Sequence, residues 1–220
     1  MASHMFTNVK CLIFDFDGTI IDTMFDYAKE LADLVSKLTS LSYDHVYKRY
    51  LKTSGIPSSY QIREILRGYP DSIVFRINQE FLKIKRRILM NKDVYPEFRY
   101  VVNVVRRRGL MVFISSNLEQ DLLDEFVATK GINVDEALGF RGESFMKGKP
   151  HIEYIINRYN LSTNNIIFIA DSLKDVEYAR QCNILFIGVE GTFRSEDFKK
   201  IDPNIPVISN LSQIIKLLKI

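Results

Sequence analysis

Four short apolar runs, separated by segments of helical periodicity, are the feature that most constrains the fold of this 220-residue chain. The runs are VKCLIF (9–14), LMVFIS (110–115), NIIFIA (165–170) and ILFIGV (184–189). The helical segments lie near 97–108, 118–130, 150–159 and 173–182. A strand that is apolar along its whole length is buried on both faces, as in a parallel sheet covered by helices. The order therefore predicts an α/β fold with a doubly wound, Rossmann-like parallel sheet.

The segment 23–92 has a different pattern, because it contains helical stretches and no strand signal. In FDYAKELADLVSKL, for example, apolar residues recur at three- and four-residue spacing. We therefore expect an all-helical cap domain at 23–92, inserted after the first strand of a core domain formed by 6–22 and 93–220. The basic run KIKRR (83–87) within this cap is typical of a solvated helix face.

The composition is that of a soluble globular protein, with 46% hydrophobic and 26% charged residues. The formal net charge of +3 is too small to indicate nucleic-acid binding, and no apolar stretch is long enough for a membrane span. No signal peptide is evident, and MASHM (1–5) is typical of a cloning scar. Cys11 and Cys182 lie in apolar segments, as inert thiols do in a reducing compartment. We expect a cytoplasmic monomer or weak homodimer without nucleic-acid or membrane partners.

Polar side chains follow three of the expected strands at the points where the strands end. They are Asp15, Asp17, Ser115, Ser116, Asn117, Asp171 and Asp175. The carboxyl ends of parallel strands lie side by side, and open α/β sheets bind ligands in the crevice outside them. Carboxylates at close range repel one another and are costly to bury, so the cluster indicates a bound cation. Oxygen ligands from a few carboxylates suit Mg²⁺.

Each of these features also has a simpler interpretation. A run such as Ser115-Ser116-Asn117 is typical of a helix N-cap, and a lysine before Pro150 is typical of a solvated position. Asp175 is the kind of acid that the helix dipole favours in a first turn. None of these interpretations explains why all the features occur in order at adjacent strand ends.

The motif DFDGTIID resembles the first motif of the haloacid dehalogenase superfamily, whose pattern is Asp-x-Asp-Gly-Thr. Ser115, at the end of an apolar strand, is similar to the second motif, and Lys149 in KGKP is similar to the third. The stretch ADSLKD resembles the fourth motif, with Ala170 where glycine is usual. The resemblance spans nearly the whole chain, and it is greatest to the phosphatase branch with a helical cap, the phosphoglycolate phosphatase-like group.

This resemblance implies a role for each matching residue. Asp15 would attack phosphorus as the nucleophile, and Asp17 would act as general acid and then as general base. Ser115 and Lys149 would bind the transferring phosphoryl oxygens, with Lys147 as a competing candidate for the lysine. The Mg²⁺ ligands would be the Asp15 side chain, the Asp17 main-chain carbonyl, Asp171 and Asp175. Further substrate contacts would come from Gly18, Thr19, Ser116 and Asn117.

The loop TSGIPSSYQIR (53–63) in the cap is expected to close over the site and to select the leaving group. Its residues Ser54 and Ser58 suit a small polar or anionic phosphoester. The resemblance and this loop together imply a Mg²⁺-dependent phosphatase that hydrolyses a small phosphorylated metabolite through an aspartyl-phosphate.

Three other functions share parts of this pattern. A phosphomutase of the same superfamily keeps all four motifs and differs in whether the cap admits water or a second phosphosugar. A haloacid dehalogenase uses the same nucleophile but has no aspartate at the position of Asp17. A non-catalytic module that binds a phosphorylated ligand need not keep together the four residues Asp15, Asp17, Lys149 and Asp171. Phosphate release that requires Mg²⁺ and is lost with EDTA separates the enzyme from such a module.

Overall fold

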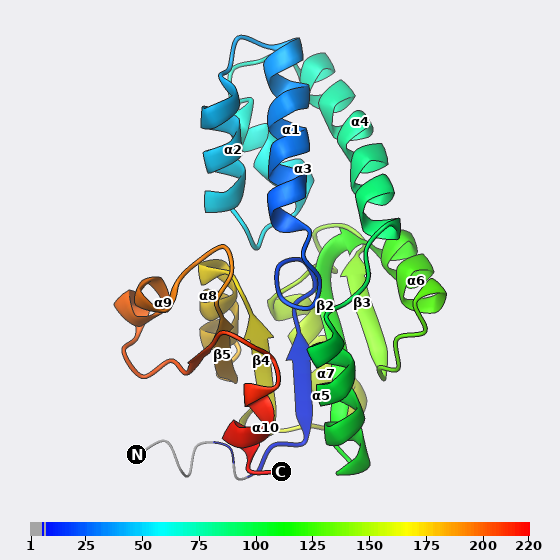
Figure 1. Cartoon of the computed structure of the whole chain (residues 1–220), viewed down its shortest axis with the longest axis vertical. Coiled ribbons are helices and arrows are strands. Elements are labelled where there is room, and N and C mark those ends of the chain that lie inside the picture. The colour runs from blue at the N-terminus through cyan, green and yellow to red at the C-terminus, as the bar shows by residue number, and fades with distance from the viewer. Residues whose placement is uncertain (1–5, 7) are drawn as a thin grey trace.

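The computed structural model describes residue 6 and residues 8–220, and it has a helix-covered sheet with a lobe of helices beyond one end of it (Figure 1). The expected cloning scar at 1–5 lies outside the described residues. Within the described chain, no helix combines the length and the apolar character that a membrane crossing requires.

A parallel sheet of six strands is the centre of the described chain, with the strand order β3-β2-β1-β4-β5-β6. The strands are β1 (Cys11–Phe14), β2 (Met111–Glu119), β3 (Glu136–Phe140), β4 (Ile166–Ala170), β5 (Leu185–Val189) and β6 (Val207–Ile208). Ile13 at the centre of β1 is in register with Phe113 on β2 and Phe168 on β4. The predicted doubly wound parallel sheet is confirmed, and the four apolar runs form β1, β2, β4 and β5.

Two strands of the sheet are not predicted from the sequence. The edge strand β3 is short and half-exposed at Glu136 and Ala137, so it lacks the continuous apolar pattern of the others. The other missed strand, β6, has only two residues. The helix expected at 118–130 begins at Gln120, because β2 continues through Glu119.

Helices cover both faces of the sheet because successive residues of a strand point to opposite sides. Phe14 belongs to the hydrophobic cluster that includes residues of α5, and its ring meets Phe98 edge-on with centroids 5.2 Å apart. Its neighbour Ile13 packs in a second cluster with Ile152 of α7 and Val176 of α8. The core helices are α5 (Pro96–Arg107), α6 (Gln120–Thr129), α7 (Lys149–Tyr159), η2 (Thr163–Asn165), α8 (Leu173–Gln181), α9 (Ser195–Ile201) and α10 (Gln213–Leu218).

The remaining helices gather in the lobe beyond the carboxyl ends of the strands (Figure 1). They are α1 (Met24–Leu38), α2 (Tyr43–Lys52), α3 (Ser58–Ile65) and α4 (Asp71–Met90). They share a hydrophobic cluster of their own, in which Tyr27 and Tyr50 both pack edge-on against Phe81. This separate cluster supports our proposal that 23–92 is a cap domain on a core of 6–22 and 93–220.

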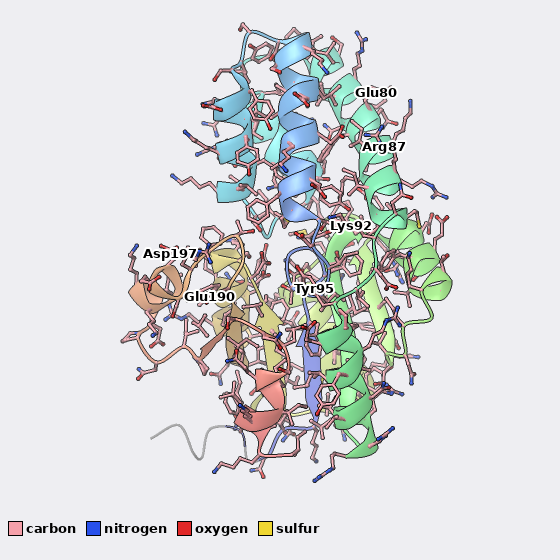
Figure 2. The ribbon with its side chains drawn as sticks, viewed as in Figure 1. Glu80, Arg87, Lys92, Tyr95, Glu190 and Asp197 are labelled. Carbon is pink, nitrogen blue, oxygen red and sulfur yellow. The ribbon has the colours of Figure 1, made fainter. Side chains whose placement is uncertain are left out.

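The two connections between cap and core lie side by side. The main-chain N–H of Tyr95, on the returning connection, donates to the carbonyl of Ile20, on the outgoing one, at 2.8 Å. Lys92 pairs with Asp26 of α1 at 2.6 Å just above this bond (Figure 2). The chain therefore passes from core to cap and back at one place, where its two connecting segments are hydrogen-bonded to each other.

Candidate active site

The turn after β1 holds the first two aspartates of the site. The N–H of Asp15 donates to the carbonyl of Ile169 on β4 at 2.9 Å, which fixes the start of the turn. Gly18 has a φ of +80°, and a Cβ there would lie 2.4 Å from Oδ2 of Asp171. Only glycine allows both the left-handed backbone and this close approach. The turn DFDG therefore packs directly against the carboxylate of Asp171.

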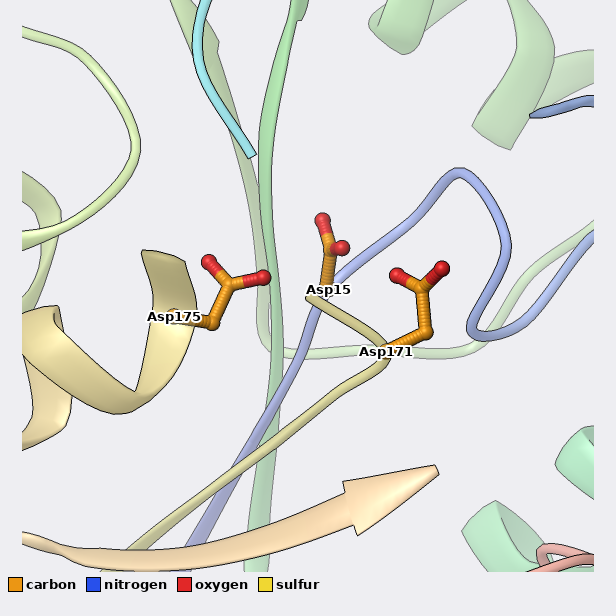
Figure 3. A group of neighbouring side chains, drawn as sticks. All are labelled: Asp15, Asp171 and Asp175. Carbon is orange, nitrogen blue, oxygen red and sulfur yellow. The ribbon is translucent and has the colours of Figure 1, made fainter. Parts of the chain in front are cut away.

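Three buried aspartates come together at the carboxyl ends of β1 and β4. Figure 3 shows the carboxylate of Asp15 between those of Asp175 and Asp171. One oxygen from each lies within 4.8 Å of the others. Asp171 follows β4 directly, and Asp175 lies in the first turn of α8, where the Ser172 hydroxyl accepts from its N–H and donates to its Oδ2. The strand ends thus bring together three of the four carboxylates in the predicted cluster.

This cluster has the properties of a cation site. Burial, reinforced by the charge of Asp15, raises the pKa of Asp171 well above its ordinary value. Burial also raises the pKa of Asp175 to about 6, against the opposing charge of Lys147. Oδ2 of Asp171 is buried and, among the described residues, has no hydrogen-bond partner. A hard divalent cation would satisfy this oxygen and stabilise the ionised carboxylates.

The lysine of the site is Lys147. Its ammonium lies 3.0 Å from Oδ1 of Asp15 and 3.0 Å from Oδ1 of Asp175, and its side chain is buried. Burial disfavours the ammonium, but the charges of the two aspartates outweigh that cost and raise the pKa of Lys147. Lys149, which we expect at this place from the sequence, opens α7, is largely exposed and pairs with Glu153 at 3.5 Å. The expected placement of Lys149 is therefore corrected to Lys147.

Of the two consecutive serines in β2, Ser115 differs from the expectation and Ser116 agrees with it. Ser115 is fully buried and faces α7, where its hydroxyl lies 3.0 Å from Nδ1 of His151. Nε2 of His151 lies 3.2 Å from the Gly139 carbonyl, so Nε2 carries the proton and Nδ1 accepts from Ser115. Ser116, one residue on, lines the cavity beside Asp15. Because strand side chains alternate, only one of two consecutive serines can face the site.

A cavity of about 40 Å³ lies between the aspartates and the cap. Its core side is lined by Asp15, Asp17, Ser116, Asn117 and Lys147. Its cap side is lined mainly by Tyr50, Ser54, Ser58, Gln61 and Lys85. The site is thus enclosed by both parts of the chain, and the expected loop residues Ser54 and Ser58 are among those that enclose it.

Asp17 occupies the cap-facing side of the turn. Thr23 donates a hydrogen bond of 2.5 Å to its Oδ1. Burial raises the pKa of Asp17, and the positive charge of Lys85 opposes this shift. Asp17 is not part of the group of three carboxylates that lie within 4.8 Å of one another.

The other expected substrate contacts divide into two kinds. Asn117 lines the cavity and links its two sides, because its amide donates to the Gly55 carbonyl of the cap loop at 3.0 Å and accepts from the N–H of Lys147 at 3.1 Å. Thr19 instead holds Asp171, since its hydroxyl donates to Oδ1 at 3.3 Å and accepts from the N–H at 3.1 Å. Gly18 and Thr19 therefore position a carboxylate and do not line the cavity.

Lys85 is a charged residue of the cavity that we do not predict from the sequence. The KIKRR run is typical of a solvated face, yet Lys85 is only 3% exposed. The signal was its position, because it continues the buried stripe of α4 formed by Val74, Ile77 and Phe81. A lysine at an apolar register position of a helix indicates a buried charge with a partner or a function.

The family model for haloacid dehalogenase-like hydrolases matches residues 12–189. A phosphoglycolate phosphatase of Agrobacterium fabrum is 21% identical over 205 residues, covering 89% of this chain and 86% of the relative. A phosphoglycolate phosphatase of Aquifex aeolicus is 20% identical over 222 residues, which cover 96% of this chain and 97% of the relative. Among solved structures, a predicted phosphoglycolate phosphatase from Haemophilus somnus has a TM-score of 0.80 at 16% identity. The match covers 96% of this chain and 98% of that chain. At this identity the structural likeness shows the fold alone.

Proposed function

This chain belongs to the haloacid dehalogenase-like hydrolase family, and from that premise we propose that it is a Mg²⁺-dependent phosphatase that hydrolyses a small phosphomonoester through an aspartyl-phosphate on Asp15. The observation that carries the proposal is the placement of the buried Asp15 carboxylate beside Lys147, Asp171 and Asp175. A carboxylate held next to a cation site and an ammonium can meet a phosphate dianion without prohibitive repulsion. The phosphoglycolate phosphatases among the relatives support the phosphatase class.

The first step transfers the phosphoryl group to the protein. An oxygen of Asp15 bonds to phosphorus while the bond from phosphorus to the ester oxygen breaks. The leaving oxygen takes a proton from Asp17, whose carboxyl lines the cavity within reach of the charge of Lys85 on the cap. The products of this step are a neutral alcohol and an aspartyl-phosphate.

The second step restores the enzyme. Asp17, now ionised, removes a proton from a water as the water oxygen bonds to phosphorus. The bond between phosphorus and the Asp15 oxygen breaks, so inorganic phosphate leaves and Asp15 is a carboxylate again. Over both steps one water is consumed and one alcohol and one phosphate are formed.

The remaining residues of the site would bind the metal ion and the phosphoryl oxygens. Asp15, Asp171 and Asp175 would bind Mg²⁺, with the main-chain carbonyl of Asp17 as a further ligand. When bound, the ion supplies positive charge that offsets the repulsion between carboxylate and phosphate. We assign the phosphoryl oxygens to Lys147 and the Ser116 hydroxyl, in place of Lys149 and Ser115.

The test is phosphate release from a panel of small phosphomonoesters, including p-nitrophenyl phosphate, with Mg²⁺ and with EDTA. We expect release of inorganic phosphate that EDTA abolishes and added Mg²⁺ restores. Release from none of the esters, or release that EDTA leaves undiminished, would contradict the proposal. Transfer of the phosphoryl group to a second sugar phosphate, with no free phosphate, would indicate a phosphomutase instead.

A further inference from the structure

A second cavity, of about 300 Å³, borders the turn after β1 at Gly18 and Thr19. It lies between the connections to the cap and the segments that follow β5 and β6. Tyr95 and Glu190, both labelled in Figure 2, are among the residues that line it. The first cavity, between the aspartates and the cap, shares Met24 with it. The two are therefore neighbouring spaces against the same turn.

The walls of the second cavity are negatively charged. The carboxylates of Asp22, Glu97 and Glu190 line it, and no lysine or arginine of the described chain does. The hydrogen bonds to two of these acids come from neutral groups. The Asn210 amide donates to Glu97 at 3.1 Å, and the N–H of Ser195 donates to Glu190 at 3.0 Å. Asp22 is exposed, so this charged wall begins at the surface, where it attracts cations.

Two glycines form the part of the wall nearest to the aspartate cluster. A Cβ on Gly18 would lie 2.4 Å from Oδ2 of Asp171, and one on Gly191 would lie 3.8 Å from the same atom. Both glycines line the second cavity, and neither has a side chain to cover this oxygen. Oδ2 is buried and, like the Thr192 hydroxyl in the same wall, has no hydrogen-bond partner among the described residues. Buried oxygens without partners indicate an ion or water that binds them.

The first cavity offers a hydrated cation much less room. Its volume is about 40 Å³, against about 300 Å³ for the second cavity. A cavity as small as the first holds only a few waters. Mg²⁺ gives up its waters reluctantly and keeps several of them even when it is bound to protein. With the cap placed as in Figure 1, the second cavity is therefore the wider approach to the metal ligands.

We propose that the second cavity is the passage by which a hydrated divalent cation travels between solvent and Asp171, separately from the substrate, which enters under the cap. Asp22 and Glu190 attract the ion into the cavity, and the gap at Gly18 and Gly191 leads it to Oδ2 of Asp171. The inference rests on the Mg²⁺-dependent function proposed above. It adds a route by which the metal enters and leaves while the cap covers the substrate.

The experiment follows Mn²⁺ on the full chain, stripped of metal beforehand. Mn²⁺ prefers the same oxygen ligands as Mg²⁺, and its free form is visible by electron paramagnetic resonance. Rapid mixing gives the association rate, a chase with excess Mg²⁺ gives the release rate, and a titration gives Kd. Gly191→Val should slow association and release at least about tenfold, because a narrowed passage forces the ion to shed waters. A barrier on the route slows both directions equally, so Kd should stay at the wild-type value.

Gly191→Ala keeps the test valid if Gly191→Val does not fold. Its Cβ would lie 3.5 Å from the Gly18 carbonyl oxygen, an ordinary contact, so we expect a folded protein with a smaller slowing of both rates. Ser54→Val is the matched control, because it adds bulk to the first cavity, where Ser54 is 6% exposed. It should exchange Mn²⁺ as the wild type does. Slower exchange in Ser54→Val alone, or a weaker Kd with unchanged association in the Gly191 variants, would overturn the inference.

The charged wall has a test of its own. The Asp22→Asn,Glu190→Gln double variant should slow association of Mn²⁺ at least about tenfold at low ionic strength, and added salt should reduce the difference. Asp33→Asn,Asp121→Asn is the matched control, since it removes the same charge from exposed acids that line neither cavity. Equal slowing in the two double variants would show that only the net charge matters, which contradicts a passage at this wall.

Binding of Mn²⁺ to the wild type separates this inference from the proposed function. If the wild type binds Mn²⁺ and both Gly191 variants exchange it at the wild-type rates, the passage is overturned and the phosphatase function stands. If the wild type binds no Mn²⁺ and Mg²⁺ does not support phosphate release, the proposed function is overturned and this inference with it.

Discussion

Nζ of Lys147 lies 3.0 Å from Oδ1 of Asp15, and both side chains are buried. The contact joins the loop before α7 to the turn after β1, two segments more than a hundred residues apart in the chain. It places a fixed positive charge beside the proposed nucleophile, where a charge-assisted contact to a phosphoryl oxygen would form.

Lys147→Ala should therefore lower kcat/KM by roughly 10²- to 10³-fold, because it removes a positioned charge from the site. Lys149→Ala is the matched control two residues away, since Lys149 is exposed and its pair with Glu153 is worth little. Steady-state kinetics on p-nitrophenyl phosphate checks both. A large loss in Lys149→Ala with a small one in Lys147→Ala would restore the assignment made from the sequence.

The apolar runs predict four strands and the insertion point of the cap, because burial on both faces leaves a clear pattern. The residues that differ from expectation do so for local reasons. Ser116 replaces Ser115 because successive side chains of β2 point to opposite sides of the sheet, and the apolar run alone does not show which serine faces the cavity. Lys147 replaces Lys149 because α7 begins at Lys149 and removes it from the loop. Lys85 is not predicted to be buried because it lies within a run of charged residues, although its position continues the buried stripe of α4.

Asp17→Asn should affect alkyl and aryl phosphates differently. An alkyl phosphate releases a strongly basic alkoxide, so loss of the general acid should slow its first step by roughly 10²- to 10⁴-fold. The phenol that leaves an aryl phosphate is acidic and needs little protonation, so the rate of the first step should fall less than it does for an alkyl phosphate. Because the second step still lacks its base, rapid-quench kinetics with p-nitrophenyl phosphate should show a burst of phenol. Equal losses on both substrates without a burst would mean that Asp17 is misassigned.

Gly18→Ala should weaken metal binding more than it weakens the fold. The added Cβ would meet Oδ2 of Asp171 at 2.4 Å, and the backbone there has a φ of +80°. We expect the Mg²⁺ concentration needed for half-maximal activity to rise at least about tenfold, as when the groups that orient metal ligands are changed. Gly109→Ala is the control, since Gly109 also has positive φ but nothing lies within 4 Å of its Cβ position. An unchanged Mg²⁺ requirement in Gly18→Ala would contradict the assignment of Asp171.

His151 should make stability depend on pH. Burial lowers its pKa from 6.5 to about 3 in the folded protein, so between these values the unfolded chain binds a proton that the folded one excludes. The contribution to the free energy of unfolding is complete above pH 6.5, and it falls by about 1.4 kcal/mol per pH unit as the pH drops toward 3.

The measurement is urea unfolding of metal-free wild type and His151→Gln between pH 4.5 and 7.5. The stability advantage of the wild type should shrink as the pH falls below about 6.5. His45→Gln, on the exposed surface of α2, serves as the control variant. A wild-type advantage that grows toward acid pH would show that His151 is charged in the folded protein.

The covalent attachment of a phosphoryl group to Asp15 is the central step of the proposed mechanism. Asp17→Asn should be mixed with p-nitrophenyl phosphate and Mg²⁺, quenched in acid within the burst and reduced with borohydride, which converts an aspartyl-phosphate to homoserine. Peptide mass spectrometry should then find homoserine at position 15 and should not find it in the Asp15→Asn,Asp17→Asn double variant. Homoserine at another aspartate, or none during a clear burst of phenol, would contradict Asp15 as the nucleophile.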